Sequence, residues 1–465
     1  MMSGTPSTGE VSELAGVLTG AVILRGESGF DEELATFNTS VVHTPFAVVC
    51  AESVADVQAT VRFATAHGIA VGVHSTGHGY TSFTEGIMVS VRRLDSLEID
   101  PERHLITVGA GVRWRAVLEA AAPLGLAPLA GSSTDVGVVG YSLGGGLSIM
   151  GRAFGMGVDQ VHALEVVTMD GEVRHVDAHS EPDLFWGLRG GGGNLGVVTR
   201  ITVELVAVTE FYGGGIYFDG AHMRDILIAY GEWTQSIPDE MCTSLAMIWM
   251  PASPAVPEPL RGRVIAHLRV CYLGEVGAGD EMLAPMRAVA PALIDHVSMI
   301  PVTNLDAIHG DPPEPIPFYL RGTLLREVTA QTADALLSIV GADVRVPMLL
   351  WDLRHQQGAF ARIPEHAAAI SGRDAAFNLQ VVGLDLPEAS VAVHAVVDAA
   401  TLAMDPWSTG ETILNVHGAV KDEADRRRAF DDVTYERLVG LVHRYDPQGL
   451  LRHGHSVARA GMTAG

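Results

Sequence analysis

The stretch Val136-Gly-Val-Val-Gly-Tyr-Ser-Leu-Gly-Gly-Gly146 is one of three glycine-rich loops that decide the fold of this chain. The other two are Val73-His-Ser-Thr-Gly-His-Gly79 and Leu188-Arg-Gly-Gly-Gly-Gly-Asn-Leu-Gly196. Glycine reaches positive φ and lets backbone amides approach an anion with no Cβ between them. None of the loops contains lysine, so a phosphate would be held by backbone amides. One such loop alone predicts a turn, whereas three in one half of the chain predict a bound diphosphate cofactor.

Two common phosphate-binding motifs are missing from these loops. Gly190–Gly193 is not followed by the Lys and Ser/Thr of a nucleoside-triphosphate loop. No segment places G-x-G-x-x-G between a clean strand and a helix with an acid about 20 residues further on. The sequence therefore excludes a simple Rossmann domain.

Length and charge narrow the class of protein. A chain of 465 residues, 48% of them hydrophobic, exceeds one ordinary core and predicts two packed units. The net charge of -25 disfavours nucleic acids and membrane surfaces as partners, because both require basic patches. A small-molecule substrate is the expected partner, and the sequence does not predict an oligomeric state.

Targeting and cysteine patterns favour a soluble, cytoplasmic protein. Residues 1–29 lack a basic segment followed by an apolar core, and no uncharged run is long enough to span a bilayer. Cys50, Cys242 and Cys271 are widely spaced and form no C-x-x-C pair, so we expect buried thiols. No spacing of His, Asp or Glu predicts a metal site.

The N-terminal part alternates strands and helices. A strand ending at Cys50, a helix from Ser53 to His67 closed by Gly68, and a strand over Ile69–Val73 form one unit. The last strand runs into the first glycine loop and places His78 at a strand's carboxyl end, where α/β folds commonly keep ligands. Further elements are expected at Met88–Val91, Ser96–Ile99, Leu105–Ala110, Trp114–Ala122 (a helix), Val197–Val206 and a hairpin turning at Asp170-Gly171.

The pattern changes after Thr209. Val264–Tyr272 and Leu349–His355 alternate with period two, as half-buried antiparallel strands do. Helices are expected at Ala221–Ser236, Glu281–Val289, Thr332–Val340 and Ala389–Met404. This predicts an α+β unit over 207–406 with helices on one face of a sheet. The last part, Glu411–Val457, is expected to contain a short apolar strand and a charged helix, and to return to the first unit.

Four motifs together resemble a known family. Gly77-His78, the loop Gly131–Gly146, the segment Asp183–Thr199 and Tyr445-Asp-Pro447 are similar to those of the berberine-bridge-enzyme-like oxidoreductases of the vanillyl-alcohol-oxidase superfamily. The likeness covers nearly the whole chain, and Asp183–Thr199 is its most specific motif. It implies an α+β fold whose two-subdomain PCMH-type FAD-binding domain uses residues 1–206 and 407–465. Residues 207–406 would form a substrate domain, an antiparallel sheet covered by helices.

The resemblance also implies a covalent bond from His78 to the 8α-methyl group of FAD, although a lone histidine beside glycine more often has a turn or surface role. Ser133 stands where many relatives carry a second linking cysteine, so a singly linked flavin is expected. His74 replaces a usual arginine, and Ile413 stands where several sugar and terpenoid oxidases have a tyrosine base. The residues expected to bind FAD are His74, Ser75, Thr76, Gly77, His78, Gly79, Ser133, Val136, Gly137, Gly140, Tyr141, Gly144, Gly145, Gly146, Asn194, Gly196 and Val198.

The missing tyrosine leaves the catalytic base open. Flavin takes a hydride from a C–H bond whose neighbouring O–H or N–H loses a proton. His355 is the first candidate base because imidazole titrates near neutrality, with a structural hydrogen bond as the alternative. His417 and Tyr141 are weaker candidates, and Tyr141 is expected rather to pack against the cofactor. The expected substrate residues are Trp249, Trp351, Tyr319 and Arg354, with plain core (for the aromatics) or a pair with Asp352 (for Arg354) as alternatives.

Val136 stands where the family controls access of oxygen to the flavin, and its small side chain implies O2 as the electron acceptor. The expected function is an FAD-linked oxidase of a hydroxylated or phenolic secondary metabolite, releasing hydrogen peroxide. Two alternatives stay open. One is a flavin-dependent oxygenase or cyclase acting on a polyketide-like substrate, and the other is a flavin-binding protein without turnover.

Overall fold

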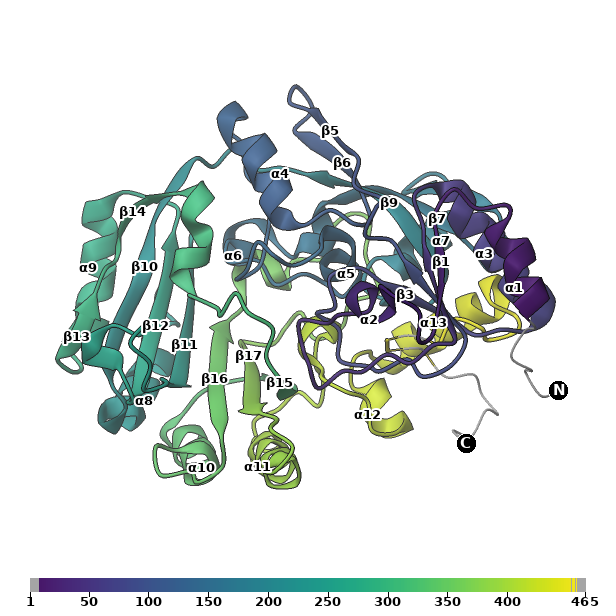
Figure 1. The fold of residues 1–465 in the computed structure, drawn as a ribbon. Helices are drawn as coiled ribbons and strands as arrows, with labels where there is room; N and C mark the ends of the chain where they lie inside the picture. Colours follow the sequence, from purple (N-terminus) through teal and green to yellow (C-terminus); the bar gives the residue numbers. More distant parts are fainter. Residues whose placement is uncertain (1–7, 453, 456, 458–465) are drawn as a thin grey trace.

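Three separate sheets organise the chain (Figure 1). The computed structural model describes residues 8–452, 454, 455 and 457. One sheet has four strands, one has five and one has eight. Mixed helices and antiparallel sheets confirm the predicted α+β class. The division at 206/207 and 406/407 stays a prediction, and the nearest strand ends are Glu204 and Glu210.

The four-stranded sheet carries the first glycine loop. Its order is β1 (Val22–Leu24), β2 (Ala47–Cys50), β4 (Ile87–Ser90) and β3 (Val71–His74), and the last three strands are parallel. Helix α3 (Val54–His67) connects β2 to β3, begins at a Ser53–Asp56 capping box and ends at Gly68 with φ 65°. The predicted strand-helix-strand unit is confirmed, and β3 delivers the loop that contains His78.

The five-stranded sheet carries the third glycine loop. Its antiparallel order is β5 (Leu97–Asp100), β6 (Leu105–Gly109), β9 (Val197–Glu204), β7 (Val161–Val167) and β8 (Val173–Asp177). The β7–β8 hairpin turns at Gly171 with φ 77°, a left-handed conformation that glycine adopts without strain. The third loop leads directly into β9, at the centre of this sheet.

The eight-stranded antiparallel sheet forms the central unit, and four helices cover its outer face (Figure 1). Its strands are β13 (Ala292–Asp295), β10 (Glu210–Asp219), β12 (Val264–Tyr272), β11 (Met241–Trp249), β16 (Met348–His355), β17 (Phe377–Leu384) and β15 (Phe318–Leu325), with β14 (Ser298–Pro301) on β10. The helices are α9 (Val276–Arg287), α8 (Met223–Trp233), α10 (Ala330–Val340) and α11 (Ser390–Leu402). The four helices and the expected one-sided cover are therefore observed.

The other face of this sheet is also buried. On β12, Ala266, Leu268 and Val270 pack under the helices, while His267 and Arg269 point away from them and are still fully buried. Strands β11, β15 and β17 are buried at almost every position. Burial of both faces therefore extends across the centre of the sheet.

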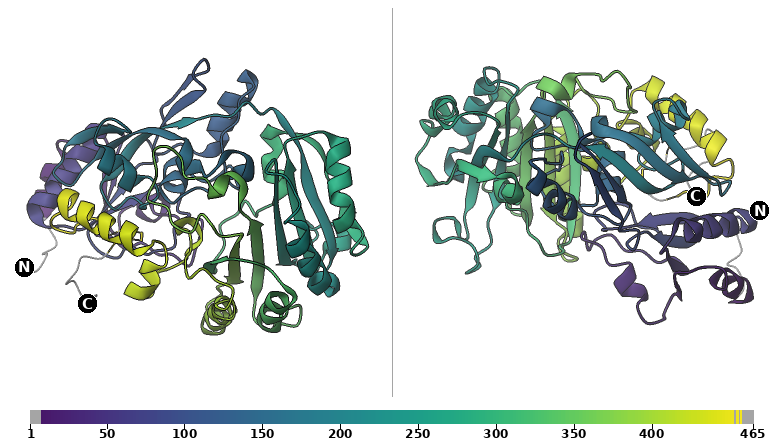
Figure 2. Two further views of the ribbon diagram at one scale, coloured as in Figure 1. Left: turned by 180° about the vertical axis from the view of Figure 1, so that it is seen from behind. Right: turned by 90° about the horizontal axis from the view of Figure 1, so that it is seen from above.

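The C-terminal part lies beside the N-terminal part, as Figure 2 shows for the view from behind. Helix α13 (Asp432–Tyr445) packs on α7 (Pro182–Leu188), and Leu451 bridges to Val71 of β3. The expected apolar strand is wrong: the described residues of 411–457 contain no strand, and Leu414–Val416 forms a short 3-10 helix. The remaining helices are α1 (Thr8–Ala15), α2 (Phe30–Glu33), α4 (Trp114–Ala121), α5 (Val138–Leu143), α6 (Gly151–Phe154) and α12 (Glu423–Arg427).

Membrane crossing would need a long apolar helix. In the described part of the chain, no helix combines the length and the apolar composition that a span requires.

The carboxylate of Asp56 ties the N-terminal segment to α3. It accepts backbone N–H bonds from Thr19 (2.8 Å), Gly20 (3.2 Å), Glu52 (2.9 Å) and Ser53 (3.1 Å). Burial alone would raise the pKa of Asp56, but these four donors outweigh burial and lower the pKa below its ordinary value. The carboxylate therefore stabilises the fold in its charged form.

Asp56→Asn is expected to lower the free energy of unfolding by about 1–3 kcal/mol at neutral pH, because the amide accepts fewer and weaker hydrogen bonds. Since the folded pKa is depressed, the stabilisation is complete above about pH 4 and fades as the pH falls through the folded pKa. Urea unfolding at several pH values measures this difference. The exposed Asp31→Asn is the control, and an equal loss in both variants at every pH would contradict the assignment.

Candidate active site

A large cavity lies where the three glycine loops meet the buried face of the central sheet. Its volume is about 430 Å³, within the range of small-molecule sites. The loop after β3, the loop around α5 and the third glycine loop form most of its wall. Phe318, Arg354 and Gln380 close it from the central sheet, and Leu414–Val416 with Leu451, Gly454 and His455 close it from the C-terminal part.

His78 lies in the wall of this cavity with one ring nitrogen free. Its Nδ1 is 3.0 Å from Oγ1 of Thr76, and its ring stacks on Phe37 with centroids 4.5 Å apart and an interplanar angle of 11°. Its Nε2 has no hydrogen-bond partner among the described residues. Burial, assisted by the charge of Arg113, lowers the pKa of His78 to about 4. The imidazole is therefore neutral at physiological pH, oriented from two sides and open to the cavity.

Arg92 holds the His78 loop from behind. Its Nε donates to the backbone oxygen of Ser75 (2.7 Å), and its Nη2 donates to Ala35 (2.7 Å) and lies 3.0 Å from Nε2 of His74. Gly77 has φ 73°, and a Cβ there would lie 2.6 Å from Cα of Thr36. The loop path therefore depends on a glycine and on an arginine that the motif itself does not contain.

Asn415 fixes the second glycine loop. Its Nδ2 donates to the backbone oxygen of Tyr141 (3.1 Å), and its Oδ1 accepts from the amide of Gly146 (2.6 Å). The hydroxyl of Tyr80 donates to the backbone oxygen of Asn415 (2.7 Å). A Cβ on Gly144 would lie 2.6 Å from Nδ2 of Asn415, so this turn admits only glycine. The two glycine loops and the C-terminal part are thus joined at the cavity wall.

The side chain of Asn194, in the third glycine loop, binds the C-terminal segment and does not line the cavity. Its Nδ2 donates to the backbone oxygens of Gly191 and His455, and its Oδ1 accepts from the amide of Val457 (3.1 Å). Gly192, Gly193 and Gly196 of the third loop line the cavity, as does Val198 at the start of β9.

The cavity wall fits a diphosphate cofactor. Among the described residues that line it there is no carboxylate, and Arg354 is the only one with a permanent positive charge. A molecule with net charge -25 would repel phosphates in most places, so a long wall without acidic groups is informative. Backbone amides of the glycine loops supply the donors. FAD is thus compatible with the residues present, with its phosphates held by loops rather than by cationic side chains.

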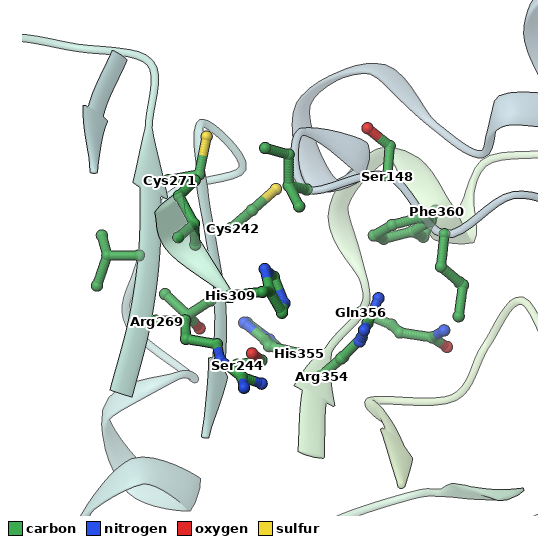
Figure 3. A pocket seen from close by; sticks show the side chains of 15 residues that line it. Ser148, Cys242, Ser244, Arg269, Cys271, His309, Arg354, His355, Gln356 and Phe360 are labelled. Atoms are coloured by element: carbon green, nitrogen blue, oxygen red, sulfur yellow. The ribbon is translucent and has the colours of Figure 1, made fainter. Parts of the chain in front are cut away.

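A second, smaller pocket of about 40 Å³ adjoins the large cavity, and Leu147 and Arg354 line both. Figure 3 shows nitrogen-bearing side chains, Arg269, His309 and His355, gathered on one side of it. The thiols of Cys242 and Cys271 lie on another side, and burial raises the pKa of both. In the described part of the chain, no three His, Cys, Asp or Glu side chains are placed so that they could hold a metal ion together.

His355 lines the smaller pocket, not the large cavity. Its Nε2 is 3.1 Å from Nη1 of Arg152 and 3.1 Å from Oε1 of Gln357, while its Nδ1 is buried without a partner. Burial, and then the charge of Arg152, lower its pKa to about 3. A group with so low a pKa is a weak general base at neutral pH, although its free nitrogen can take part in a hydrogen bond.

The other two candidate bases are bound within the protein. His417 is fully buried, and its Nε2 donates to the backbone oxygen of Asp425 (2.8 Å). Tyr141 lines the cavity, but its hydroxyl donates to the backbone oxygen of Leu129 (3.0 Å), and burial raises its pKa above the ordinary value. We therefore keep neither as a proton acceptor. Tyr141 lines the cavity, and its contact with the cofactor stays a prediction.

Of the expected substrate residues, only Arg354 reaches a cavity. Trp351 is fully buried and donates from Nε1 to the backbone oxygen of Val340 (3.2 Å). The hydroxyl of Tyr319 donates to Asp398 (3.0 Å), and Trp249 packs against the same core under the helices. The period-two pattern placed Trp351 on one face with Leu353, and both residues lie in the core under the helices.

Comparisons with known proteins agree with this geometry. The family described as FAD binding domain matches residues 45–177. An FAD-linked oxidoreductase of Dictyostelium discoideum is 25% identical over 337 residues, covering 71% of each chain. The (R)-6-hydroxynicotine oxidase of Paenarthrobacter nicotinovorans is 32% identical over 191 residues, or 40% of this chain and 42% of that one. The structure of 6-hydroxy-D-nicotine oxidase from Arthrobacter nicotinovorans superposes with a TM-score of 0.83 at 22% identity, covering 95% of this chain and 98% of that one.

The chain carries an FAD binding domain, has the PCMH-type fold of its structural neighbours and is an FAD-dependent oxidoreductase. The matched FAD-binding segment of this oxidoreductase contains the first two glycine loops, so the predicted cofactor class agrees with the match. Fourteen of the seventeen residues expected to bind FAD lie in the wall of the large cavity; Gly145, Gly146 and Asn194 do not. Their distance from bound FAD stays untested.

Several cavity residues of the oxidoreductase escaped the sequence reasoning. Tyr80 follows the first loop by one residue, and Asn415 stands beside Ile413, so closer attention to the motif flanks would have found both. Gln380, Arg269 and His309 had no such signal. His309 follows a 3-10 helix with no periodic pattern, and the other two lie on strands whose second face is hidden only in the folded chain.

Gly140→Leu tests whether the large cavity holds the flavin. Gly140 lines the cavity, and no atom lies within 4 Å of a Cβ built on it, so a leucine side chain would extend into open space. We expect an unchanged circular dichroism spectrum but roughly tenfold or greater loss of bound flavin absorbance, because overpacking a site costs about 1–3 kcal/mol. Gly440→Leu, on the exposed side of α13 with the same free space, is the control. Full flavin content in Gly140→Leu would exclude this cavity.

Proposed function

We propose that this oxidoreductase is an oxidase of a phenolic or otherwise hydroxylated small molecule, with O2 as the electron acceptor. The observation that carries the proposal is the pair of adjoining cavities. One has the acid-free, glycine-rich wall that suits FAD, and the other is a polar pocket beside it. When bound, FAD accepts a hydride from the substrate and passes the electrons to O2, yielding hydrogen peroxide.

The residues of the chain favour a substrate with an acidic hydroxyl. His355, His417 and Tyr141 are weak or occupied as proton acceptors, for the reasons given above. A phenol loses its proton more easily than an alcohol, so it depends less on a strong protein base. Gln380, whose buried Nε2 lacks a partner, lines the large cavity and supplies a donor for a developing phenolate oxygen.

His78 is proposed to bond covalently to the flavin. With Nδ1–H donating to Thr76, the lone pair lies on Nε2, the nitrogen that is free in the cavity wall. The depressed pKa keeps that lone pair unprotonated at neutral pH, and the Phe37 stack holds the ring in place. Ser133 also lines the cavity, and its hydroxyl offers no thiol for a second link. We therefore propose a single bond through Nε2. Its formation would remove one proton from the 8α-methyl group and one from the imidazole and would leave the flavin reduced by two electrons, which O2, the electron acceptor proposed above, would then remove as hydrogen peroxide.

Val136 lines the same cavity and is proposed to leave room for O2. Its isopropyl group is smaller than most side chains that would block a diffusion path, and the neighbouring Gly137 adds no bulk. Residues Leu143, Leu147 and Phe318 keep this part of the wall apolar, which favours oxygen over water.

Anaerobic mixing with a panel of phenols is expected to bleach the flavin absorbance with at least one member. Admission of O2 should then restore the colour and release equimolar hydrogen peroxide, because two electrons pass from each flavin to each O2. Both signals are read in one cuvette with a peroxide-coupled dye.

The scarcity of strong bases in the wall also suits an oxygenase, the second candidate, because oxygen transfer depends less on substrate deprotonation. Turnover under 18O2 separates the two: label in the product instead of in peroxide would replace the oxidase proposal by the oxygenase. Flavin that no panel member bleaches would support a binding protein without turnover.

His78→Ala should yield protein whose flavin is released by acid precipitation, whereas the wild-type flavin should stay with the polypeptide. Thr76→Val, nearly isosteric and lacking the hydroxyl, should lower the covalently bound fraction because the ring loses its hydrogen bond. Peptide mass spectrometry and fluorescence of the precipitate measure both. Flavin still bonded to the His78→Ala polypeptide would show a different anchor and overturn the assignment.

A further inference from the structure

The smaller pocket contains buried polar groups that no protein atom satisfies. His309 is 8% exposed and neither of its ring nitrogens has a partner among the described residues. Nδ1 of His355 is in the same state. Buried polar groups are normally hydrogen-bonded, so a cluster of unpaired ones facing a pocket indicates a bound molecule. Figure 3 shows these side chains directed toward the same space.

Two arginines share a single carboxylate beneath this space. Nη1 of Arg269 donates to Oδ1 of Asp352 (3.0 Å), and Nε of Arg354 donates to Oδ2 (2.7 Å). Arg269 and Asp352 are each 2% exposed. Arg269 is also held through Nε by Nδ1 of His267 (3.2 Å). The two arginines are therefore fixed in position by the protein and not by solvent.

The charges of Arg269, Arg354 and Asp352 do not sum to zero. Two guanidinium groups face one carboxylate, and burial keeps the neighbouring imidazoles of His309 and His355 neutral by lowering their pKa values. Asp311, half-buried, is the next acid near Arg354 but forms no ion pair with it. The terminal amino groups of Arg354 have no partner among the described residues. The side chain of Arg354 is only 21% exposed. A largely buried positive charge that its neighbours balance only in part favours an anion bound beside it.

We propose that the smaller pocket binds a carboxylate group of the substrate, with Arg354 and His309 as its donors. The proposal rests on the proposed function, since it gives the substrate of that reaction a second, anionic end. The planar guanidinium edge matches the two oxygens of a carboxylate. Asp352, Arg269 and His267 are positioning residues that hold Arg354 at the junction of the two cavities.

The size of the pocket agrees with this ligand. A volume of about 40 Å³ holds roughly three water-sized groups, as many heavy atoms as a carboxylate has. Because Arg354 lines both cavities, a carboxylate bound to it extends from a ring lying in the large cavity. The thiols of Cys242 and Cys271 and the ring of Phe360 form the apolar remainder of the wall. The substrate class is therefore a phenolic or hydroxylated acid.

The test uses benzoate as the probe and benzamide as its neutral match. Calorimetry on the purified full chain measures both affinities, and the flavin difference spectrum follows the same titration. The wild-type protein should bind benzoate about 10- to 100-fold more tightly than benzamide. Arg354→Gln and His309→Leu should each weaken benzoate about tenfold or more and leave benzamide unchanged. Arg224→Gln, which removes the same charge from an exposed pair with Asp334, should leave both unchanged.

Arg354→Lys keeps the positive charge, so it reports on binding even if Arg354→Gln does not fold. It should bind benzoate about 3- to 10-fold more weakly than the wild type, because a lysine cannot form the paired hydrogen bonds. Equal affinity for benzoate and benzamide, or wild-type benzoate affinity in all three pocket variants, would overturn the proposal. Failure to take up flavin while benzoate selectivity persists would refute the proposed function and leave the carboxylate site standing.

Discussion

The side-chain amide of Asn415 joins three distant segments around the cofactor cavity. It bonds the second glycine loop at Tyr141 and Gly146, and its backbone oxygen accepts the hydroxyl of Tyr80 beside the first loop. The close approach leaves no room for a side chain at Gly144. Without these hydrogen bonds the second glycine loop would have no fixed conformation, because glycine by itself has no preferred backbone conformation. The shape of the cavity wall along the second glycine loop depends on these hydrogen bonds.

Covering the central sheet on both faces has a chemical consequence. Helices bury one face with apolar side chains, while the other face carries the buried pair Arg269–Asp352 and the half-buried Arg354. In such surroundings a charge interacts strongly with its neighbours, and an unpaired one favours a ligand of opposite sign. The same burial lowers the pKa values of His78 and His355, so both imidazoles are neutral at physiological pH.

The two cavities divide the proposed work. The glycine-lined cavity excludes acidic groups and suits a cofactor that carries its own phosphates, so its wall needs shape more than charge. The smaller pocket has the opposite character, since it offers a concentrated positive charge and unpaired imidazoles in little space. Arg354 belongs to both and links the ligand's orientation to the site of oxidation.

The sequence by itself determined the features that depend on local chemistry. The glycine loops, the α3 capping box, the left-handed Gly68 and Gly171 and the one-sided helical cover follow from backbone freedom and hydrophobic period. The sequence did not predict strands β11, β15 and β17. Of the two roles considered for Trp351 and Tyr319, substrate contact and core, the structure shows core. Only the tertiary structure decided which face of the central sheet meets the cavity. It also brought Asn415, Gln380, His309 and Arg269 to the site. Alternation along a strand separates two faces but does not say what covers each, because that depends on segments hundreds of residues away.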